Sequence, residues 1–415
     1  MAERPQASTE PTTPGARAPF SHLAPAIAAA GVFLVATLVW AVAGGSLPGG
    51  RWFAVHLFTL GVVSNLVTAM TFHFSRTLLH SRGADARQGR LALLNAGAVA
   101  LLAGRAGGWL PLVAIGGSVV SAAVVWLYVD LRRQRKAALE ARFAYVVRAY
   151  ERACSQFFHG ALLGILLGTG VLSGSWYGAG RLAHMHVNVL GWAGVTLLAT
   201  VVFFGPTMMR ARVQPGADEA ARGALRSGTT GLSVAALALL AGGWQGGPQT
   251  LLRLLAGAGL VVYAIGAARI CLPVLRAGTK AVPSAHTWLI EAACVWFVAA
   301  AAADGVVVAS GRGELLDAVG AVLLAGVLAQ AILAALSYLG PMALVAGTTA
   351  RNAARATLDT AARLRATVLN LGVVALATAA AADVGGWLAA LGWAALATAV
   401  VTQLVLLAWV GVRRG

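Results

Sequence analysis

Charge is scarce in this chain of 415 residues, since Asp, Glu, Lys and Arg together make up only 11% of it. Soluble domains carry roughly 25% charged residues. Apolar residues make up 59% of the chain, and its mean hydropathy is +0.78. The composition therefore excludes a large water-soluble domain and predicts an integral protein of the cell membrane.

Cysteine is also scarce. Cys154, Cys271 and Cys294 lie far apart and form no C-x-x-C pair, so neither a disulfide framework nor a thiolate metal site is predicted. No nucleotide-binding glycine loop and no H-E-x-x-H zinc motif occurs in a supporting context. The first 20 residues have no apolar core, so we expect no cleavable signal peptide, and residues 1–22 are predicted to be a disordered cytoplasmic N-terminus.

Long apolar runs, in contrast, are plentiful. About 20 apolar residues are needed for a helix to cross a bilayer, and twelve such segments can be drawn. They are residues 24–43, 52–75, 91–108, 110–130, 157–174, 183–206, 228–243, 251–272, 286–309, 317–339, 366–382 and 387–410. We therefore predict an all-α integral membrane protein with twelve transmembrane helices, in which residues 23–411 form one membrane domain and residues 412–415 a cytoplasmic tail.

Acidic residues number 14 against 31 Lys and Arg, which gives a formal charge of +17. Nucleic-acid binding could explain such a charge, but the cations are spread unevenly over the loops. The termini and the loops after even-numbered spans hold 26 of them; the other five are Arg51, Arg105, Arg181, Arg253 and Arg312. This bias follows the positive-inside rule. It predicts cytoplasmic termini and contact with anionic lipid rather than with nucleic acid.

Two segments of the chain resemble each other at a constant offset of 130 residues. They share the pattern G-R-x4-H-x3-L-G, in which Arg51 and His56 correspond to Arg181 and His186. A fainter third copy follows at an offset of 135, and Ala321 takes the histidine position there. Self-similarity of this kind predicts three repeats of four helices, at about residues 24–130, 157–272 and 286–410.

A bundle of three four-helix units with histidines near the outer ends of helices 2 and 6 resembles subunit I of the haem–copper oxidase superfamily and the NnrS-type haem–copper membrane proteins. The stretch HLFTLGVVSNLVTAMTFHFSRTLL, residues 56–79, is also similar to membrane helices that precede cupredoxin domains in actinobacterial copper nitrite reductase fusions. The resemblance implies haem or copper as cofactor and a cupredoxin-type or cytochrome redox partner. The oxidase histidines that follow helix 6 and lie on helix 10 are missing, so a complete oxygen reductase is not implied.

Histidines are the principal candidate ligands. His56 and His186 are predicted to bind haem or copper, because neutral imidazole suits both; a hydrogen bond to a facing helix is the alternative. His184 is a weaker candidate, because two residues correspond to about 200° around a helix, so His184 and His186 cannot both face one metal unless the helix begins between them. His184 is therefore expected at the membrane–water interface. His73, 17 residues from His56, is another weaker candidate, for a separate site or a proton relay, with a snorkelling role as the alternative.

Charged and amide side chains complete the candidates. Arg51 and Arg181 precede His56 and His186 by five residues and would bind haem propionates or phosphate headgroups. Glu291 is predicted to be the one acidic residue clearly within a span, with proton handling as its candidate role. The amide side chains are expected to join helices; they are Asn65, Asn95, Gln330, Asn370 and Gln403.

Two functions follow from these residues. The first is a haem- or copper-binding membrane protein of respiratory or nitrogen-oxide metabolism that is not an enzyme on its own. The second is a metal-free permease or scaffold that has lost the ancestral ligands, as Ala321 has in the third copy. The sequence leaves both open, because function belongs to sites rather than to folds.

Overall fold

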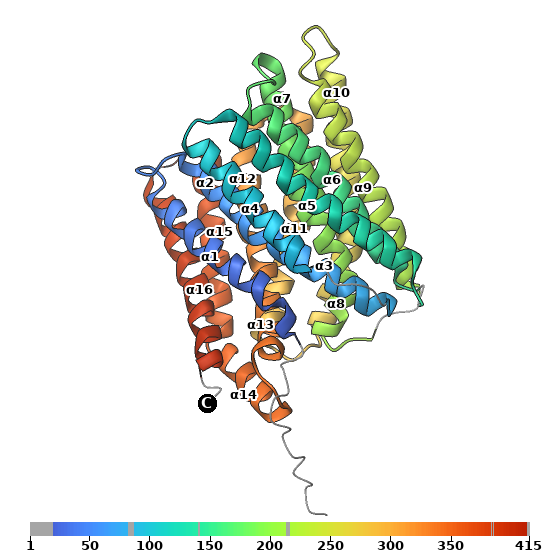
Figure 1. The fold of residues 1–415 in the computed structure, drawn as a ribbon, viewed down its shortest axis with the longest axis vertical. Coiled ribbons are helices and arrows are strands. Elements are labelled where there is room, and N and C mark those ends of the chain that lie inside the picture. The colour runs from blue at the N-terminus through green and yellow to red at the C-terminus, as the bar shows by residue number, and fades with distance from the viewer. Residues whose placement is uncertain are drawn as a thin grey trace, which may run out of the picture.

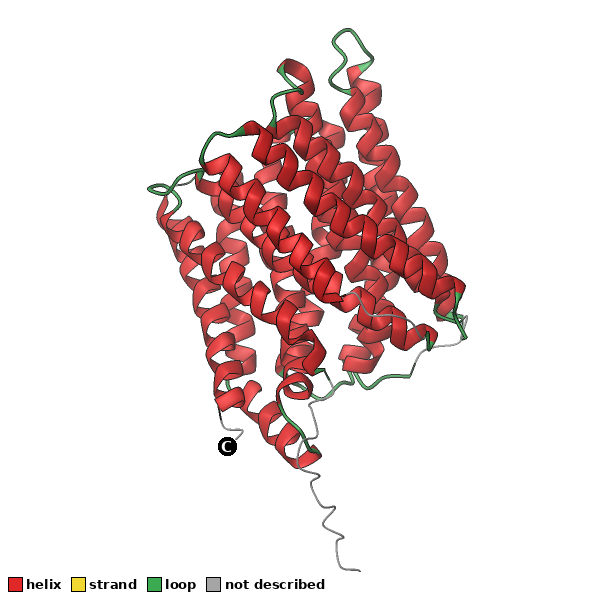
Figure 2. Ribbon diagram, in the orientation of Figure 1, coloured by secondary structure: helices red, strands yellow, loops and turns green. Residues whose placement is uncertain are grey.

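The computed structural model describes residues 20–81, 87–139, 142–212, 216–382, 384 and 386–412. All secondary structure in these ranges is helical, and they contain no strand (Figure 2). Most of the predicted disordered segment, residues 1–19, lies outside the described residues, whereas Ser21–Leu23 form a short 3-10 turn, η1. Of the predicted tail, Val412 ends the last helix, and residues 413–415 lie outside the described part.

Twelve long helical segments run through the described residues, side by side in one bundle (Figure 1). Nine are continuous α-helices: α1 Ala24–Ala43, α4 Arg87–Ala106, α5 Leu110–Lys136, α6 Ala144–Gly168, α9 Ala217–Ala241, α10 Gln249–Gly278, α11 Ala285–Ser310, α15 Ala362–Ala382 and α16 Gly386–Val412. The other three contain a π-helical turn. They are α2 Gly50–His56, η2 Leu57–Val63 and α3 Ser64–Leu79; α7 Gly174–His186, η3 Val187–Gly194 and α8 Val195–Met208; and η4 Gly313–Leu315, α12 Leu316–Ala321, η5 Val322–Ala329 and α13 Gln330–Leu344.

Ten of these segments are long and apolar enough to cross a membrane. The two others in the described part are α4, which carries three arginines, and α6, which carries Arg148, Glu151 and Arg152 near its start. Large apolar side chains lie exposed on the outer helices, among them Val32, Leu237, Leu251 and Leu371. Exposed apolar surface on this scale is typical of contact with lipid rather than with water. The chain is thus an all-helical membrane protein of the multi-pass type.

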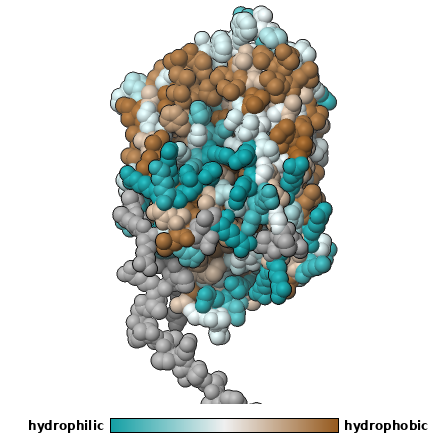
Figure 3. Space-filling view, turned by 90° about the vertical axis from the view of Figure 1, so that its right-hand side faces the viewer, coloured by the Kyte–Doolittle hydropathy of each residue, from teal (hydrophilic) through white to brown (hydrophobic). Residues whose placement is uncertain are grey.

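The two ends of the bundle differ in charge. The end where α5 finishes and α6 and α9 begin, at the bottom in Figure 1, carries a high density of arginines, and we call it the basic end. On the face shown in Figure 3, hydrophilic side chains gather in the middle and lower parts, and hydrophobic ones cover the upper part. The opposite end, where α2 and α7 begin, includes the exposed Arg51 and Arg181.

The three π-helical turns begin directly after His56, His186 and Ala321. These are the three positions that the sequence alignment makes equivalent. The π-helix accounts for well under 1% of residues in proteins, and it often occurs at functional sites. In the first of the turns, the N–H of Ser64 donates to the carbonyl of Thr59, five residues earlier. Sequence patterns did not predict these turns.

Amide side chains join neighbouring helices, as predicted. Asn65 on α3 and Asn95 on α4 exchange hydrogen bonds of 2.8 and 2.9 Å. Gln330 on α13 donates to Asn370 on α15 at 3.0 Å. Gln403 on α16 donates to a serine of α13 at 3.1 Å. The helix-joining role of all five amides is therefore confirmed.

An additional helix, α14 Thr348–Leu358, lies where the sequence predicted a loop. It is amphipathic, and its Ala354 and Leu358 pack against Val410 near the end of α16. Arg351 and Arg355 are half-buried on the same helix, and the Arg355 guanidinium lies 5.8 Å from the centre of the Tyr338 ring. A helix of 11 residues is too short to span a bilayer, so a search for long apolar runs does not detect it.

Glycine allows α9 and α10 to pack closely. A Cβ atom on Gly259 would meet the backbone carbonyl of Gly231, and the reverse also holds. We predict that Gly259→Val lowers the free energy of unfolding by about 3 kcal/mol, the upper end for overpacking, because a backbone atom cannot move aside. Denaturant unfolding in detergent measures this change. Gly223→Ala is the matched control, since nothing lies within 4 Å of its added Cβ; equal stability of the two variants would refute the packing argument.

Candidate functional site

His56 and His184 form a pair at the end of the bundle where α2 and α7 begin. His56 is the last residue of α2, and His184 is the third residue from the end of α7. Their rings are nearly parallel, with an interplanar angle of 19°, and the ring centroids are 6.3 Å apart. Both side chains are half-buried. The structure thus brings together two imidazoles from the second helices of the first two predicted repeats.

Backbone carbonyls fix the tautomer of both rings. Nδ1 of His56 lies 2.8 Å from the carbonyl oxygen of Trp52, and Nδ1 of His184 lies 2.7 Å from that of Gly160. A carbonyl oxygen only accepts hydrogen bonds, so Nδ1 carries the proton, and Nε2 of the neutral ring keeps its lone pair. Neither Nε2 atom has a hydrogen-bond partner among the described residues. Metal-binding histidines are commonly held through the second nitrogen in this way.

The distance between the two ring centroids leaves room for one metal ion when both Nε2 atoms turn towards it. Imidazoles that bind one ion from opposite sides, with metal–nitrogen distances of about 2.0–2.1 Å, have ring centroids roughly 6–6.5 Å apart. The observed 6.3 Å agrees with this range. No group of three or more His, Cys, Asp or Glu side chains suited to a metal occurs in the described residues. Two protein ligands are nevertheless enough for haem iron, which takes its other ligands from the porphyrin, or for copper(I).

Neighbouring residues position the pair. The Trp52 indole stacks on the His56 ring with centroids 3.8 Å apart, and the Arg105 guanidinium of α4 lies over the indole at 5.7 Å. Gly164 of α6 leaves room for His184, because a Cβ atom there would lie 2.8 Å from Cε1 of the ring. The Asn188 side chain donates to the backbone carbonyl of His184 at 2.8 Å. His56 is therefore held by Trp52 of its own helix, and His184 by α6 and by Asn188.

His186 faces a different part of the bundle. Its Nδ1 lies 2.7 Å from the carbonyl of Leu182, and its Nε2 lies 3.1 and 3.2 Å from the two carboxylate oxygens of Asp304 on α11. Both ring nitrogens are thus engaged. His184 and His186 point in different directions, as their spacing on a helix predicted. The geometry favours His184 as the partner of His56, the reverse of the ranking expected from the sequence.

Asp304 is a functional candidate that sequence reasoning misses. Its residue exposure is only 2%, and it lies on α11, one of the helices long enough to span the membrane. The prediction that Glu291 is the one acidic residue within a span is therefore wrong. The sequence did contain an indication of this buried acid, because Asp304 interrupts the apolar run AAAADGVVVAS. Burial is possible since the Asp304 carboxylate faces the His186 ring.

The remaining candidates lie apart from the histidine pair. Arg51 forms an exposed ion pair of 2.9 Å with Asp317, and Arg181 is exposed on α7. Glu291 is half-buried, and its carboxylate packs against Gly278 at the end of α10. The propionate-binding role of the arginines and the proton-handling role of Glu291 stay predictions.

His73 contacts a second histidine near the basic end. Its Nδ1 lies 3.1 Å from Nε2 of His22, and the Phe20 ring packs edge-on against it. One of these two nitrogens must therefore donate to the other. The contact is separate from His56 and His184, and the proton-relay role of His73 stays a prediction.

Compared with known proteins, the chain matches no protein-family model and none of the curated proteins.

Proposed function

We propose that this membrane protein binds one haem or one copper ion between His56 and His184. It would carry electrons or handle metal in respiratory or nitrogen-oxide metabolism, together with a cupredoxin-type or cytochrome partner. The observation that carries the proposal is the pair of parallel rings, 6.3 Å apart, each with Nδ1 at a backbone carbonyl. Haem or copper, when bound, supplies one-electron redox chemistry.

The chain's own residues would prepare the two rings for a metal. The carbonyls of Trp52 and Gly160 accept hydrogen bonds from the Nδ1–H groups, which orients each ring and makes Nε2 a better electron-pair donor to a cation. The Trp52 indole covers one face of His56 and would limit the access of water. The two histidines lie on α2 and α7, and helices hold metal ligands more precisely than loops do.

The proposal includes twelve spans in three units of four helices. A glycine at the fifth position of each π-helical turn supports it. These glycines are Gly61, Gly191 and Gly326, and an added Cβ would meet Phe33, Gln156 and Trp296, respectively. The three contacting side chains lie on α1, α6 and α11, which are the first helices of the three proposed units. A shared contact between first and second helices is expected if one four-helix unit occurs three times.

The amide contacts support the same division. Asn65 and Gln330 each follow a π-helical turn closely and bond to the next long helix, through Asn95 and Asn370. These contacts join helices 2 and 3 of the first proposed unit and of the third. We further propose that the basic end and both termini face the cytoplasm of the cell, because arginines are concentrated on the cytoplasmic side of membrane proteins.

Metal content and an optical spectrum of the purified protein test the metal proposal. Protein from cells supplied with haem and copper should contain about one haem or one copper per chain. A Soret band in the spectrum identifies haem. A stoichiometric copper content without a Soret band identifies copper as the bound metal. We expect His56→Ala/His184→Ala to lose nearly all of the metal, because both proposed protein ligands are removed. His159→Ala, which changes an exposed histidine of α6, is the control.

Two results would overturn the metal proposal. A folded wild-type protein without metal would do so directly. Equal metal content in the double variant and in the wild type would also do so, because the metal would then have other ligands. Circular dichroism of each variant shows whether the helices remain folded.

The buried contact between His186 and Asp304 favours a second candidate, a metal-free permease coupled to protons. Ionisable residues within spans commonly mark proton or substrate pathways, and this pair is 6% and 2% exposed. A permease of this kind would conduct protons in proteoliposomes without metal, and Asp304→Asn would abolish the flux. A pH-sensitive dye inside the vesicles measures it, and unchanged flux in the variant would remove this candidate.

A further inference from the structure

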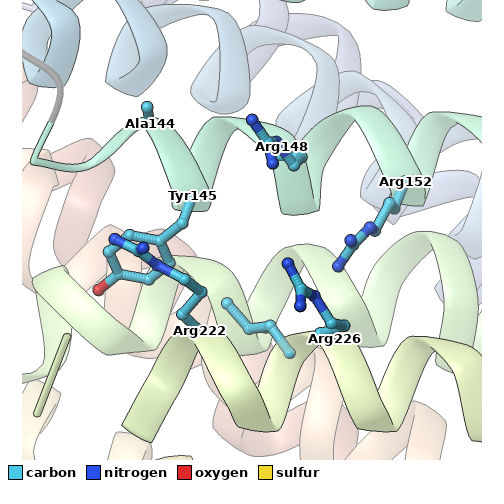
Figure 4. A pocket seen from close by; sticks show the side chains of 7 residues that line it. Ala144, Tyr145, Arg148, Arg152, Arg222 and Arg226 are labelled. Carbon is cyan, nitrogen blue, oxygen red and sulfur yellow. The ribbon is translucent and has the colours of Figure 1, made fainter. Parts of the chain in front are cut away.

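Four arginines line a cavity between α6 and α9 at the basic end (Figure 4). Its volume is about 350 Å³. Arg148 and Arg152 come from α6, and Arg222 and Arg226 come from α9. In Figure 4, Arg152 and Arg226 reach from their two helices into the space between them. Tyr145 forms part of the same wall.

The arrangement places like charges together. Arg148 and Arg152 are four residues apart on one helix, and so are Arg222 and Arg226 on the other. Like charges at this spacing share one face of a helix and repel each other. Burial, followed by the positive charges of Arg226 and Arg148, lowers the pKa of Arg152, which precedes the apolar part of α6. The cluster would therefore be stabilised by an anion.

The nearest carboxylates already have other partners. Glu151 accepts two hydrogen bonds from the Arg135 guanidinium, at 2.6 and 3.0 Å. Asp218 accepts one from Arg142 at 2.9 Å and one from Tyr145, in the cavity wall, at 3.1 Å. Glu219 is exposed and does not line the cavity. No carboxylate among the residues lining the cavity balances its four guanidinium groups.

We propose that this cavity binds a phosphate or pyrophosphate group, carried either by an anionic lipid or by a free organic phosphate. Guanidinium groups bind phosphate oxygens through paired, charge-assisted hydrogen bonds. Arg222 is held over the Tyr145 ring at 5.3 Å, which limits its freedom before a ligand arrives. The site is separate from the histidine pair, since His184 contacts Gly160, about two turns beyond Arg152 on α6.

Binding of two probes to the full-length protein tests this inference. Inorganic pyrophosphate, titrated by calorimetry into protein in phosphatidylcholine nanodiscs, represents the free phosphate. Phosphatidylglycerol, counted by native mass spectrometry after extraction from mixed vesicles with phosphatidylcholine, represents the lipid headgroup. Arg152→Gln/Arg226→Gln removes two of the four charges. Arg269→Gln/Arg276→Gln, which changes two exposed arginines of α10 outside the cavity, makes the same charge change.

We expect the cavity variant to bind the preferred probe roughly 10- to 100-fold more weakly, because two charge-assisted interactions are lost. The α10 variant should bind it within about twofold of the wild type, since exposed charges outside the cavity are largely screened by solvent and salt. Binding of pyrophosphate that depends on the cavity arginines supports a free organic phosphate as the ligand. Retention of phosphatidylglycerol alone, with the same dependence, supports a lipid. The proposal is overturned if neither probe binds, or if the two double variants lose binding equally.

Discussion

Asp304→Leu should lower the free energy of unfolding by about 3–5 kcal/mol, the usual cost of removing one member of a buried ionisable pair. Asp304 and His186 are 2% and 6% exposed, and their side chains lie 3.1 Å apart. The substitution leaves Nε2 of His186 facing an apolar side chain. A buried polar atom without a partner loses its hydration without compensation, so the effect should be among the largest of any single substitution in this chain.

Replacing both members of the pair should recover much of this loss. His186→Phe/Asp304→Leu is expected to be more stable than Asp304→Leu alone, because apolar residues often replace a buried ion pair at little cost. Denaturant unfolding in detergent, followed by circular dichroism, gives the three free energies. Glu314→Gln is the control, since Glu314 and its partner Arg312 are more than 60% exposed; it should change stability by less than about 1 kcal/mol. An Asp304→Leu variant as stable as this control would contradict the argument.

The long helices were predictable because lipid selects for composition over a whole segment. The span predicted at residues 286–309 corresponds to α11, Ala285–Ser310. The segment predicted at 52–75 corresponds to the rod from Gly50 to Leu79, although its π-helical turn was not foreseen. Apolar periodicity does not distinguish an α-turn from a π-turn. In η2, η3 and η5 a glycine packs against a side chain of a neighbouring helix, and no local pattern contains such a contact.

The candidate site was predictable only in part, because it too depends on contacts between helices. His56 was predicted to lie in a long apolar helix, and it lies in the segment Gly50–Leu79. His184 and His186 were predicted to face different directions, and they do. Which of the two faces His56 depends on how α7 is rotated against α6. The carbonyl of Gly160 and the space beside Gly164 fix that rotation. Neither feature can be read from the sequence around His184.

Arg90 shows where a charge pattern misleads. The distribution of cations placed it in a loop before the third span, yet it is fully buried on α4. Its guanidinium lies over the Phe72 ring at 4.5 Å and forms an ion pair with Asp130 of α5. A loop position and a buried position one turn inside a helix carry the same letter in the sequence. Arg90 is buried only because α3 and α5 pack around it, and the local sequence does not show this packing.

Arg90→Leu should therefore destabilise the protein by about 3–5 kcal/mol, comparable to the loss of a buried charge partner elsewhere. It removes the ion pair with Asp130, whose side chain is 15% exposed, and the stacking on Phe72. Thermal and denaturant unfolding in detergent measure the change. Arg132→Gln, at an exposed position of α5, is the matched control and should shift stability by roughly 0.5 kcal/mol or less.

Arg90→Lys separates charge from shape at this site. Lysine keeps the positive charge but lacks the planar fork that stacks on an aromatic ring and binds a carboxylate through two nitrogens. We expect it to recover only part of the stability lost in Arg90→Leu, since the contact with Phe72 depends on the flat guanidinium. Full recovery by lysine would show that the positive charge alone accounts for the contribution of Arg90 to stability. A leucine variant as stable as Arg132→Gln would instead show that the pair contributes little to the packing of these helices.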